Sequence, residues 1–443
     1  MGQPRPGKGL LRRRAKALAT TGGGARHRRR PGHARCRVRP SSPPRPRGGR
    51  RRQPGRRDRG APLQPPAAAA AGVTGRARQS KPVTALLAGI TAPVRGARAR
   101  AARNAQRTVN ALRLAGGLDR PQTGHSQHTI AWRQGKASLR HYTDVTGGRP
   151  VLLVPSLINR SHIWDLRPGD SFVEGLQAAG HDVFLVDWGV PDERDVGNSM
   201  STYVDQYLPA AMTAAREATG QNPVVIGHCF GGVIAALWTA STDAPPAALI
   251  CLGVPTNWLE MGPLAQMTRQ GRIDPEDILD RTGNVPPTTL LRSFQMLRPL
   301  GDLGGYVILW TRLHDRRAAQ AIWALSNWAR DHVPFPGAAF VDMVRRISRG
   351  NGLATGSVVL GDRARNLSAI KVPFLNIYGT YDHVTPPASV TPLADLVGSD
   401  DAETQSLKAG HVGLLVGSSA RKQTLPAVTA WLDARGLGAA SQR

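Results

Sequence analysis

Cysteine is scarce in this sequence: there are three cysteines among 443 residues, at positions 36, 229 and 251. Their spacing matches neither a metal site nor a disulfide framework, so we expect no bound metal, no cross-links and a reducing, cytoplasmic location. Cys251 lies in the apolar run AALICLGV and is predicted to be a core residue.

The sequence also lacks an apolar run that could cross a membrane. The longest candidate near the start, Pro82–Val94, is much shorter than the roughly 20 residues that a membrane-spanning helix needs. Arg12–Arg14 resemble the start of a twin-arginine signal or a transit peptide, but no adequate apolar segment follows them. The sequence therefore predicts neither export nor a transmembrane segment.

Acidic residues are almost absent from the first 116 residues, which hold 30 Lys and Arg side chains and one acid, Asp58. This segment accounts for the whole formal charge of +29, because residues 117–443 carry 29 basic and 29 acidic side chains. It is rich in Arg, Pro, Gly and Ala and has little apolar periodicity before about position 80. We therefore expect residues 1–116 to be largely disordered.

Three interpretations of this basic segment stay open. It could bind nucleic acid or another anionic partner, it could be inert, or it could be an over-extended start. No Met lies between Met1 and Met200, so a shorter product would begin at a non-Met start codon such as that of Val73. Outside residues 1–116 we expect no nucleic-acid binding.

Strand and helix patterns alternate along the remainder of the chain, which predicts an α/β fold with a mainly parallel sheet and helices on both faces. Strands are predicted at 129–132, 138–142, 150–154, 182–187, 223–226, 248–253, 374–378 and 403–407. Residues from Asn257 to about Gly350 lack strand patterns and include helical stretches such as Ala318–Ala329. We expect one catalytic domain over 117–443, with a mostly helical cap inserted over about 257–350 that covers the active site.

The segment Asn222–Trp238 reads NPVVIGHCFGGVIAALW: a buried strand, a glycine-framed sharp turn and a helix, with Cys229 at the apex. This pattern is typical of a nucleophile elbow, in which the small glycines let strand and helix pack closely around a strained nucleophile. An acyl group on a cysteine is a thioester and stays activated. The thiol therefore favours transfer to an alcohol at least as strongly as hydrolysis.

Two later motifs supply a base and an orienting acid. LNIYGTYDHVTPP places Asp382 just after an apolar strand, and SLKAGHVGLLV places His411 just after the last strand. The order nucleophile, acid, histidine is that of the α/β-hydrolase fold. We predict a Cys229–His411–Asp382 triad, with an oxyanion hole formed by the backbone N–H groups of Phe230 and Leu157.

Neighbours of the triad allow simpler interpretations. His228 and His383 are adjacent to triad residues but are expected to be structural. The bulky Phe230 could narrow the acyl pocket and bias the protein to short side chains, or it could be a core residue of the elbow helix.

Taken together, the motifs resemble those of polyhydroxyalkanoate synthases of the short, class III-like type that works with a second subunit. The resemblance covers about 148–437 and rests on VLLVPSLINR, FLVDWGVPD, GHCFGG, GNGLATGSVVLGD, YDHVTPP and AGHVGLLV. It implies that Cys229, Asp382 and His411 polymerise (R)-3-hydroxyacyl-CoA through an acyl-cysteine, with release of CoA. The basic amino-terminal segment matches nothing in the short synthases.

The resemblance also implies partners. These are the (R)-3-hydroxyacyl-CoA substrate, the growing polyester chain and a second synthase subunit, with a location at cytoplasmic polyester granules. No metal or bound cofactor is expected, because CoA arrives with the substrate, and a homodimer stays open.

Two other classes of function remain as alternatives. A thioesterase or a polyester depolymerase would use the same fold and triad with water as the acceptor. A non-catalytic granule-associated or nucleic-acid-binding protein would use the basic segment and leave the core inert.

Overall fold

The computed structural model describes residues 82–145, 147–262, 265–266, 270–272, 274–297 and 310–439. Most of the basic amino-terminal segment, residues 1–81, lies outside the described residues, and so does the part of the disorder prediction that concerns it.

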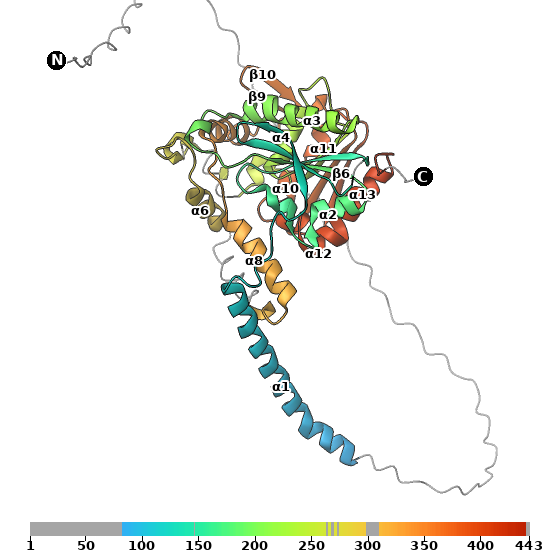
Figure 1. Cartoon of the computed structure of the whole chain (residues 1–443). Coiled ribbons are helices and arrows are strands. Elements are labelled where there is room, and N and C mark those ends of the chain that lie inside the picture. Colours follow the sequence, from blue (N-terminus) through green and yellow to red (C-terminus); the bar gives the residue numbers. More distant parts are fainter. Residues whose placement is uncertain are drawn as a thin grey trace, which may run out of the picture. The chain divides into compact units, whose positions relative to one another are not determined.

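A sheet forms the centre of the fold (Figure 1). It has eight strands in the order β1-β2-β6-β3-β7-β8-β11-β12. The last six strands in this order run parallel, whereas β1 and β2 are antiparallel to their neighbours. All eight predicted strands are confirmed. They are β1 (His128–Gln134), β2 (Ala137–Tyr142), β3 (Pro150–Val154), β6 (Asp182–Asp187), β7 (Val224–His228), β8 (Ala248–Leu252), β11 (Phe374–Gly379) and β12 (Ala402–Leu407).

Helices cover both faces of the sheet, because the central strands are apolar on both sides. On β3, Leu152 and Val154 pack into one core cluster, and Val151 and Leu153 pack into the other. The first cluster includes side chains of α3 (Leu208–Thr219), α4 (Phe230–Thr239) and α11 (Leu393–Leu396). The second includes those of α2 (Phe172–Ala178) and α13 (Leu425–Asp433). The predicted α/β-hydrolase architecture is thus confirmed.

The described part of the insertion after β8 is helical and lies beyond the carboxyl ends of the parallel strands. It contains η4 (Trp258–Glu260), η5 (Pro275–Ile278), α6 (Pro287–Leu297), α8 (Arg316–Arg330), α9 (Gly337–Asp342) and η6 (Met343–Ser348). We call these elements the cap. Its two halves are joined by reciprocal backbone hydrogen bonds between Val285 and Phe335, at 2.9 and 3.0 Å.

The cap is also fastened to the body of the domain. The buried Asn284 side chain donates to the Asp192 carbonyl at 2.8 Å and accepts from the Gly337 N–H at 3.2 Å. Asp342 accepts from the Met200 N–H at 3.1 Å. Because these bonds join several separate segments, the described cap elements have a defined position over the sheet edge.

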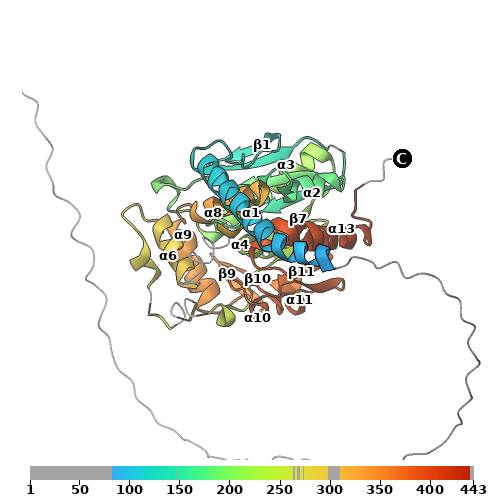
Figure 2. The same ribbon diagram turned by 90° about the horizontal axis from the view of Figure 1, so that it is seen from below.

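The amino-terminal segment differs from expectation in its last third, where Pro82–Ala115 forms the helix α1. Ala, Leu and Arg, which dominate this stretch, favour helix formation. Tertiary contacts hold its last turns: the buried Asn110 donates to the Leu313 carbonyl at 2.6 Å, and Leu114 packs against Leu313 and Ala319 next to α8 (Figures 1 and 2). The composition predicted the charge of this segment, but it did not predict the contacts with Leu313 and Ala319 that hold the last turns of α1.

Two smaller features lie around β11. Residues 387–396 form two short helices, α10 (Pro387–Val390) and α11, because Pro392 interrupts the hydrogen-bond ladder between them. A hairpin of β9 (Ser357–Leu360) and β10 (Arg363–Asn366) was not predicted. Of the helices formed by the described residues, none is both long and apolar enough to span a bilayer.

The other short elements of the described chain connect these layers. They are β4 (Asp165–Arg167), β5 (Asp170–Ser171), η1 (Ser161–Trp164), η2 (Glu193–Asp195), η3 (Thr202–Tyr207), η7 (Leu367–Ala369), η8 (Val412–Leu414), α12 (Gly417–Ser419) and η9 (Ala420–Thr424).

Candidate active site

Cys229 occupies the turn between β7 and α4 in a backbone conformation that non-glycine residues rarely adopt, with φ 53° and ψ −129°. Such a conformation costs on the order of 1–3 kcal/mol and persists only where the surroundings enforce it. Two hydrogen bonds enforce it here: the Cys229 N–H donates to the Leu252 carbonyl at 2.9 Å, and its carbonyl accepts from the Gly232 N–H at 3.0 Å. The turn therefore holds the sulfur at the edge of the sheet.

Glycines permit this turn because strand and helix nearly touch. A Cβ atom on Gly227 would lie 2.5 Å from the Gly232 Cα, and one on Gly231 would lie 2.2 Å from the Val154 carbonyl oxygen. Neither approach is tolerable for a side chain, so the GHCFGG motif is a steric requirement of the elbow.

The structure brings His411 and Asp382 together beyond the ends of the last two strands. Asp382 follows β11, His411 follows β12, and the His411 Nδ1–H donates to the Asp382 Oδ2 at 2.8 Å. The Asp382 side chain is fully buried and that of His411 is 9% exposed, so water hardly competes for this bond.

Charges in this cluster favour an imidazolium at His411. Burial opposes the charge, but the Cys229 sulfur and the Asp382 carboxylate outweigh it and raise the pKa of His411 to about 10. Burial likewise opposes ionisation of Asp382, yet hydrogen bonds from His411 and Thr385 keep its pKa below the ordinary value. The three groups thus form one electrostatically coupled unit.

Thr385 is a further member of the cluster that the sequence analysis did not single out. Its hydroxyl donates to the Asp382 Oδ2 at 2.8 Å and lies 3.0 Å from the His411 Nδ1. The backbone N–H groups of Val384 and Thr385 donate to the other carboxylate oxygen, both at 2.8 Å. The carboxylate is thereby fixed in one orientation, and the motif YDHVTPP was the available signal for it.

His228, expected to be structural, lies directly against His411, with ring centroids 4.6 Å apart. Its Nε2–H donates to the His411 carbonyl at 3.3 Å, and Trp164 packs edge-on against its ring. Burial, followed by the positive charge of His411, lowers the pKa of His228 to about 3. His228 is therefore neutral near pH 7 and does not compete for the proton on His411. The other neighbouring histidine, His383, has an exposed side chain.

The loop after β3 is held by bonds to its carbonyl groups. Trp188 donates to the Pro155 carbonyl at 2.9 Å, and Trp328 of the cap donates to the Arg160 carbonyl at 2.8 Å. The Val333 N–H donates to the Ile158 carbonyl at 3.1 Å.

Side chains of this loop differ in what they face. Leu157 is buried in the core and lines neither cavity beside Cys229, whereas Ser156 lines both. The Ser156 hydroxyl is buried without a hydrogen-bond partner among the described residues. An oxyanion hole uses backbone groups, so the assignment of Phe230 and Leu157 stays a prediction.

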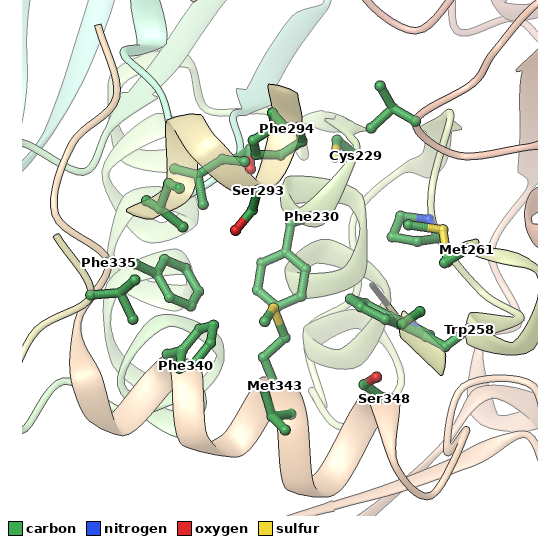
Figure 3. A pocket seen from close by; sticks show the side chains of 18 of the residues that line it. Cys229, Phe230, Trp258, Met261, Ser293, Phe294, Phe335, Phe340, Met343 and Ser348 are labelled. Atoms are coloured by element: carbon green, nitrogen blue, oxygen red, sulfur yellow. The ribbon is translucent and has the colours of Figure 1, made fainter. Parts of the chain in front are cut away.

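Two cavities meet at Cys229. The larger, of about 190 Å³, is almost entirely apolar, and Figure 3 shows the ring of Phe230 in its middle, with Phe335 and Phe340 on one side and Trp258 on the other. The smaller, of about 160 Å³, has His228 and His411 in its wall. Phe230 is only 6% exposed and packs against Phe335 at 6.1 Å between centroids, so it is both a core residue and part of the cavity wall.

Among the described residues, no group of three or more His, Cys, Asp or Glu side chains is arranged to hold a metal ion. Cys251 is fully buried in β8, where burial raises the pKa of its thiol. Of the two described cysteines, Cys229 alone borders a cavity.

A model of the alpha/beta hydrolase fold family matches residues 149–418, so this chain belongs to that family. Its match covers the elbow, the cap, Asp382 and His411.

Within the family, the chain is similar to poly(3-hydroxyalkanoate) polymerase subunits. It is 28% identical to that of Haloarcula marismortui over 339 residues, which are 72% of this chain and 70% of the relative. It is 29% identical to that of Allochromatium vinosum over 320 residues, 71% of this chain and 90% of the relative. A third such subunit, from Synechocystis, is 28% identical over 327 residues, 71% of this chain and 86% of the relative. The resemblance predicted from the motifs is confirmed.

Proposed function

We propose that this chain is a polyhydroxyalkanoate synthase that joins (R)-3-hydroxyacyl groups into a polyester and releases CoA. The observation that carries the proposal is a cysteine on the elbow of an α/β-hydrolase fold, coupled to a buried His–Asp pair, in a chain similar to polymerase subunits. A thioester on Cys229 keeps the acyl group activated for attack by a hydroxyl group.

In the first half-reaction, the Cys229 thiolate attacks the carbonyl carbon of the acyl-CoA thioester. The imidazolium of His411, held by Asp382, then gives its proton to the CoA sulfur as the bond between carbon and that sulfur breaks. The oxyanion formed on the way is held by the Phe230 N–H and an N–H of the loop after β3, for which we propose Leu157. CoA leaves, and the acyl group remains on Cys229.

In the second half-reaction, His411 is neutral and takes the proton of a 3-hydroxyl group from another unit or from the growing chain. The alkoxide attacks the acyl-Cys229 carbonyl, the bond between carbon and Sγ breaks, and an ester forms. The thiolate and imidazolium are thereby restored, so the cycle needs no other reactant. The cap limits the access of water, which would otherwise yield a free acid.

Its relatives are named as subunits, and we propose that this chain likewise works with a second subunit and at the surface of the polyester that it makes. The neutral body of the domain, with its 29 basic and 29 acidic residues over 117–443, gives no charge-based reason to expect nucleic acid at the active site.

The test is an assay of the purified chain with (R)-3-hydroxybutyryl-CoA and longer homologues, with and without a candidate second subunit. CoA release and polymer mass are followed together. The proposal expects ester-linked product in proportion to CoA released. Release of CoA with only free 3-hydroxy acid would assign the chain to hydrolases of the same fold.

A further inference from the structure

The larger cavity beside Cys229 differs in chemistry from the smaller one. Apart from Cys229, its described lining residues include no titratable side chain, and their polar side-chain groups are hydroxyls and the indole N–H of Trp258. Its apolar wall comes from the elbow helix, from five cap elements and from the loops beside them, with Phe230, Met261, Leu290 and Met343 among its members. The catalytic histidine, by contrast, lines the smaller cavity.

The contrast between the two cavities matches the contrast between two substituents at C3 of an acyl chain on Cys229, the hydroxyl group and the monomer side chain. The hydroxyl at C3 is polar, so it suits the smaller cavity, where His228 and His411 line the wall. The other carbon substituent at C3, the side chain of the monomer, has no polar atom. It is therefore suited to the apolar cavity that opens on the other side of the sulfur.

The size of the larger cavity sets the expected length of that side chain. A cavity of about 150 Å³ lined by apolar side chains is large enough to hold benzene, which has six carbon atoms. This cavity measures about 190 Å³ with Phe230 already in its wall. A methyl group, as in a 3-hydroxybutyryl unit, would leave most of it empty and forgo most of the available contacts.

We propose that the larger cavity holds the monomer side chain of the acyl group on Cys229, and that the preferred substrates are (R)-3-hydroxyacyl-CoA thioesters with side chains of about three to six carbons. This inference rests on the proposed function and names its substrate class. Met343 determines the length limit: Figure 3 shows it reaching from η6 toward the ring of Phe230, across the floor of the cavity. Methionine side chains adapt to irregular occupants, which suits a pocket for flexible chains.

The first arm of the test compares three substrates of the full-length chain: (R)-3-hydroxybutyryl-CoA, (R)-3-hydroxyhexanoyl-CoA and (R)-3-hydroxyoctanoyl-CoA. The second subunit is added if turnover requires one. Each methylene moved from water into an apolar site is worth about fourfold in kcat/KM. We expect kcat/KM to be at least about tenfold higher for the octanoyl than for the butyryl substrate. Equal values, or a maximum at butyryl, would overturn the inference.

The second arm changes the floor of the cavity. Met343→Trp fills it and is expected to lower the octanoyl-to-butyryl ratio of kcat/KM by about tenfold or more. Met343→Ala enlarges it and should move the optimum to a longer side chain. A general loss of structure would lower kcat/KM for all substrates by the same factor. The octanoyl-to-butyryl ratio of kcat/KM therefore separates an effect on specificity from an effect on stability.

Met296→Trp is the matched control, because Met296 on α6 is 65% exposed and does not line the cavity. It should keep the wild-type ratio. A folded Met343→Trp protein with the wild-type ratio would contradict the inference, and if that variant does not fold, the wild-type series and Met343→Ala decide. Failure of the proposed function looks different: no CoA release from any substrate, or free acid as the only product.

Discussion

The sheet edge and the cap differ in how each contributes to the site. At the sheet edge, three strand ends fix Cys229, Asp382 and His411 through short backbone connections and buried hydrogen bonds. The cap supplies apolar side chains from helices joined by a few bridging hydrogen bonds. On the two proposals above, the sheet edge provides the chemistry and the cap determines which acyl group reaches it.

The largest effect is expected from removing the sulfur. Cys229→Ala should lower turnover by about ten-thousandfold or more, because alanine has no nucleophile to take up the acyl group at the elbow. The other buried cysteine gives the control: Cys251→Ala should keep turnover and cost about 1 kcal/mol of unfolding free energy. Steady-state CoA release and denaturant unfolding measure both. Full turnover in a folded Cys229→Ala protein would refute the assignment of chemistry to the elbow.

Asp382→Asn should lower kcat by about a hundredfold to ten-thousandfold, because an amide cannot hold the imidazolium as the carboxylate does. Asp395→Asn, at an exposed carboxylate on α11, should have no effect on turnover. Similar rates in the two variants would mean that the His–Asp pair is structural.

The same pair governs the pH dependence. The pKa of His411 is raised to about 10, so the imidazolium persists at neutral pH and is lost as the pH rises through that value. We expect kcat/KM to stay constant from about neutral pH upward and to fall as the pH approaches the pKa of His411, because the imidazolium then loses its proton. Asp382→Asn removes one cause of the raised pKa and should move the alkaline limb to lower pH. A limb that stays in place would show that His411 does not set it.

Thr385→Val tests the smaller contribution of the hydroxyl that bonds to Asp382. We expect about a tenfold lower kcat, since the carboxylate loses one of its hydrogen bonds but keeps two from backbone N–H groups. Thr404→Val, on the exposed side of β12, is the matched change and should leave kcat as it is. Equal kcat values for the two variants would remove Thr385 from the positioning groups.

The smallest kinetic effect is expected in the cap. Phe335→Leu removes a ring that is 1% exposed and should cost about 1–2 kcal/mol of unfolding free energy. Its effect on kcat should stay within severalfold, because Phe335 packs against Phe230 and is no part of the hydrogen-bonded His411–Asp382 pair. A loss of kcat as large as that of Asp382→Asn would abolish the distinction between sheet edge and cap.

The sequence predicted the strands and the site residues of the sheet edge one by one, whereas for the cap it predicted the helical character and approximate bounds but no individual contacts, for a physical reason. Strands buried on both faces are continuous apolar runs, and the residues that follow them, such as Asp382 and His411, must meet at one edge of a parallel sheet. The tight approaches around Gly227 and Gly231 leave a readable motif.

Contacts between distant segments leave no such local signal. The contact of His228 with His411 depends on how the end of β7 packs against the loop after β12. The bond from Trp328 to the loop after β3 and the division into two cavities depend on how the helices of the cap pack on the sheet. The ordered end of α1 depends in the same way on the docking of Asn110.

The measurement that tests the central claim most directly is mass analysis of the chain after a rapid acid quench during turnover of an (R)-3-hydroxyacyl-CoA. The account predicts one or more acyl units in thioester linkage on the peptide that contains Cys229, and none on that peptide in Cys229→Ala. Turnover with Cys229 unmodified, or with the acyl group on another side chain, would contradict it.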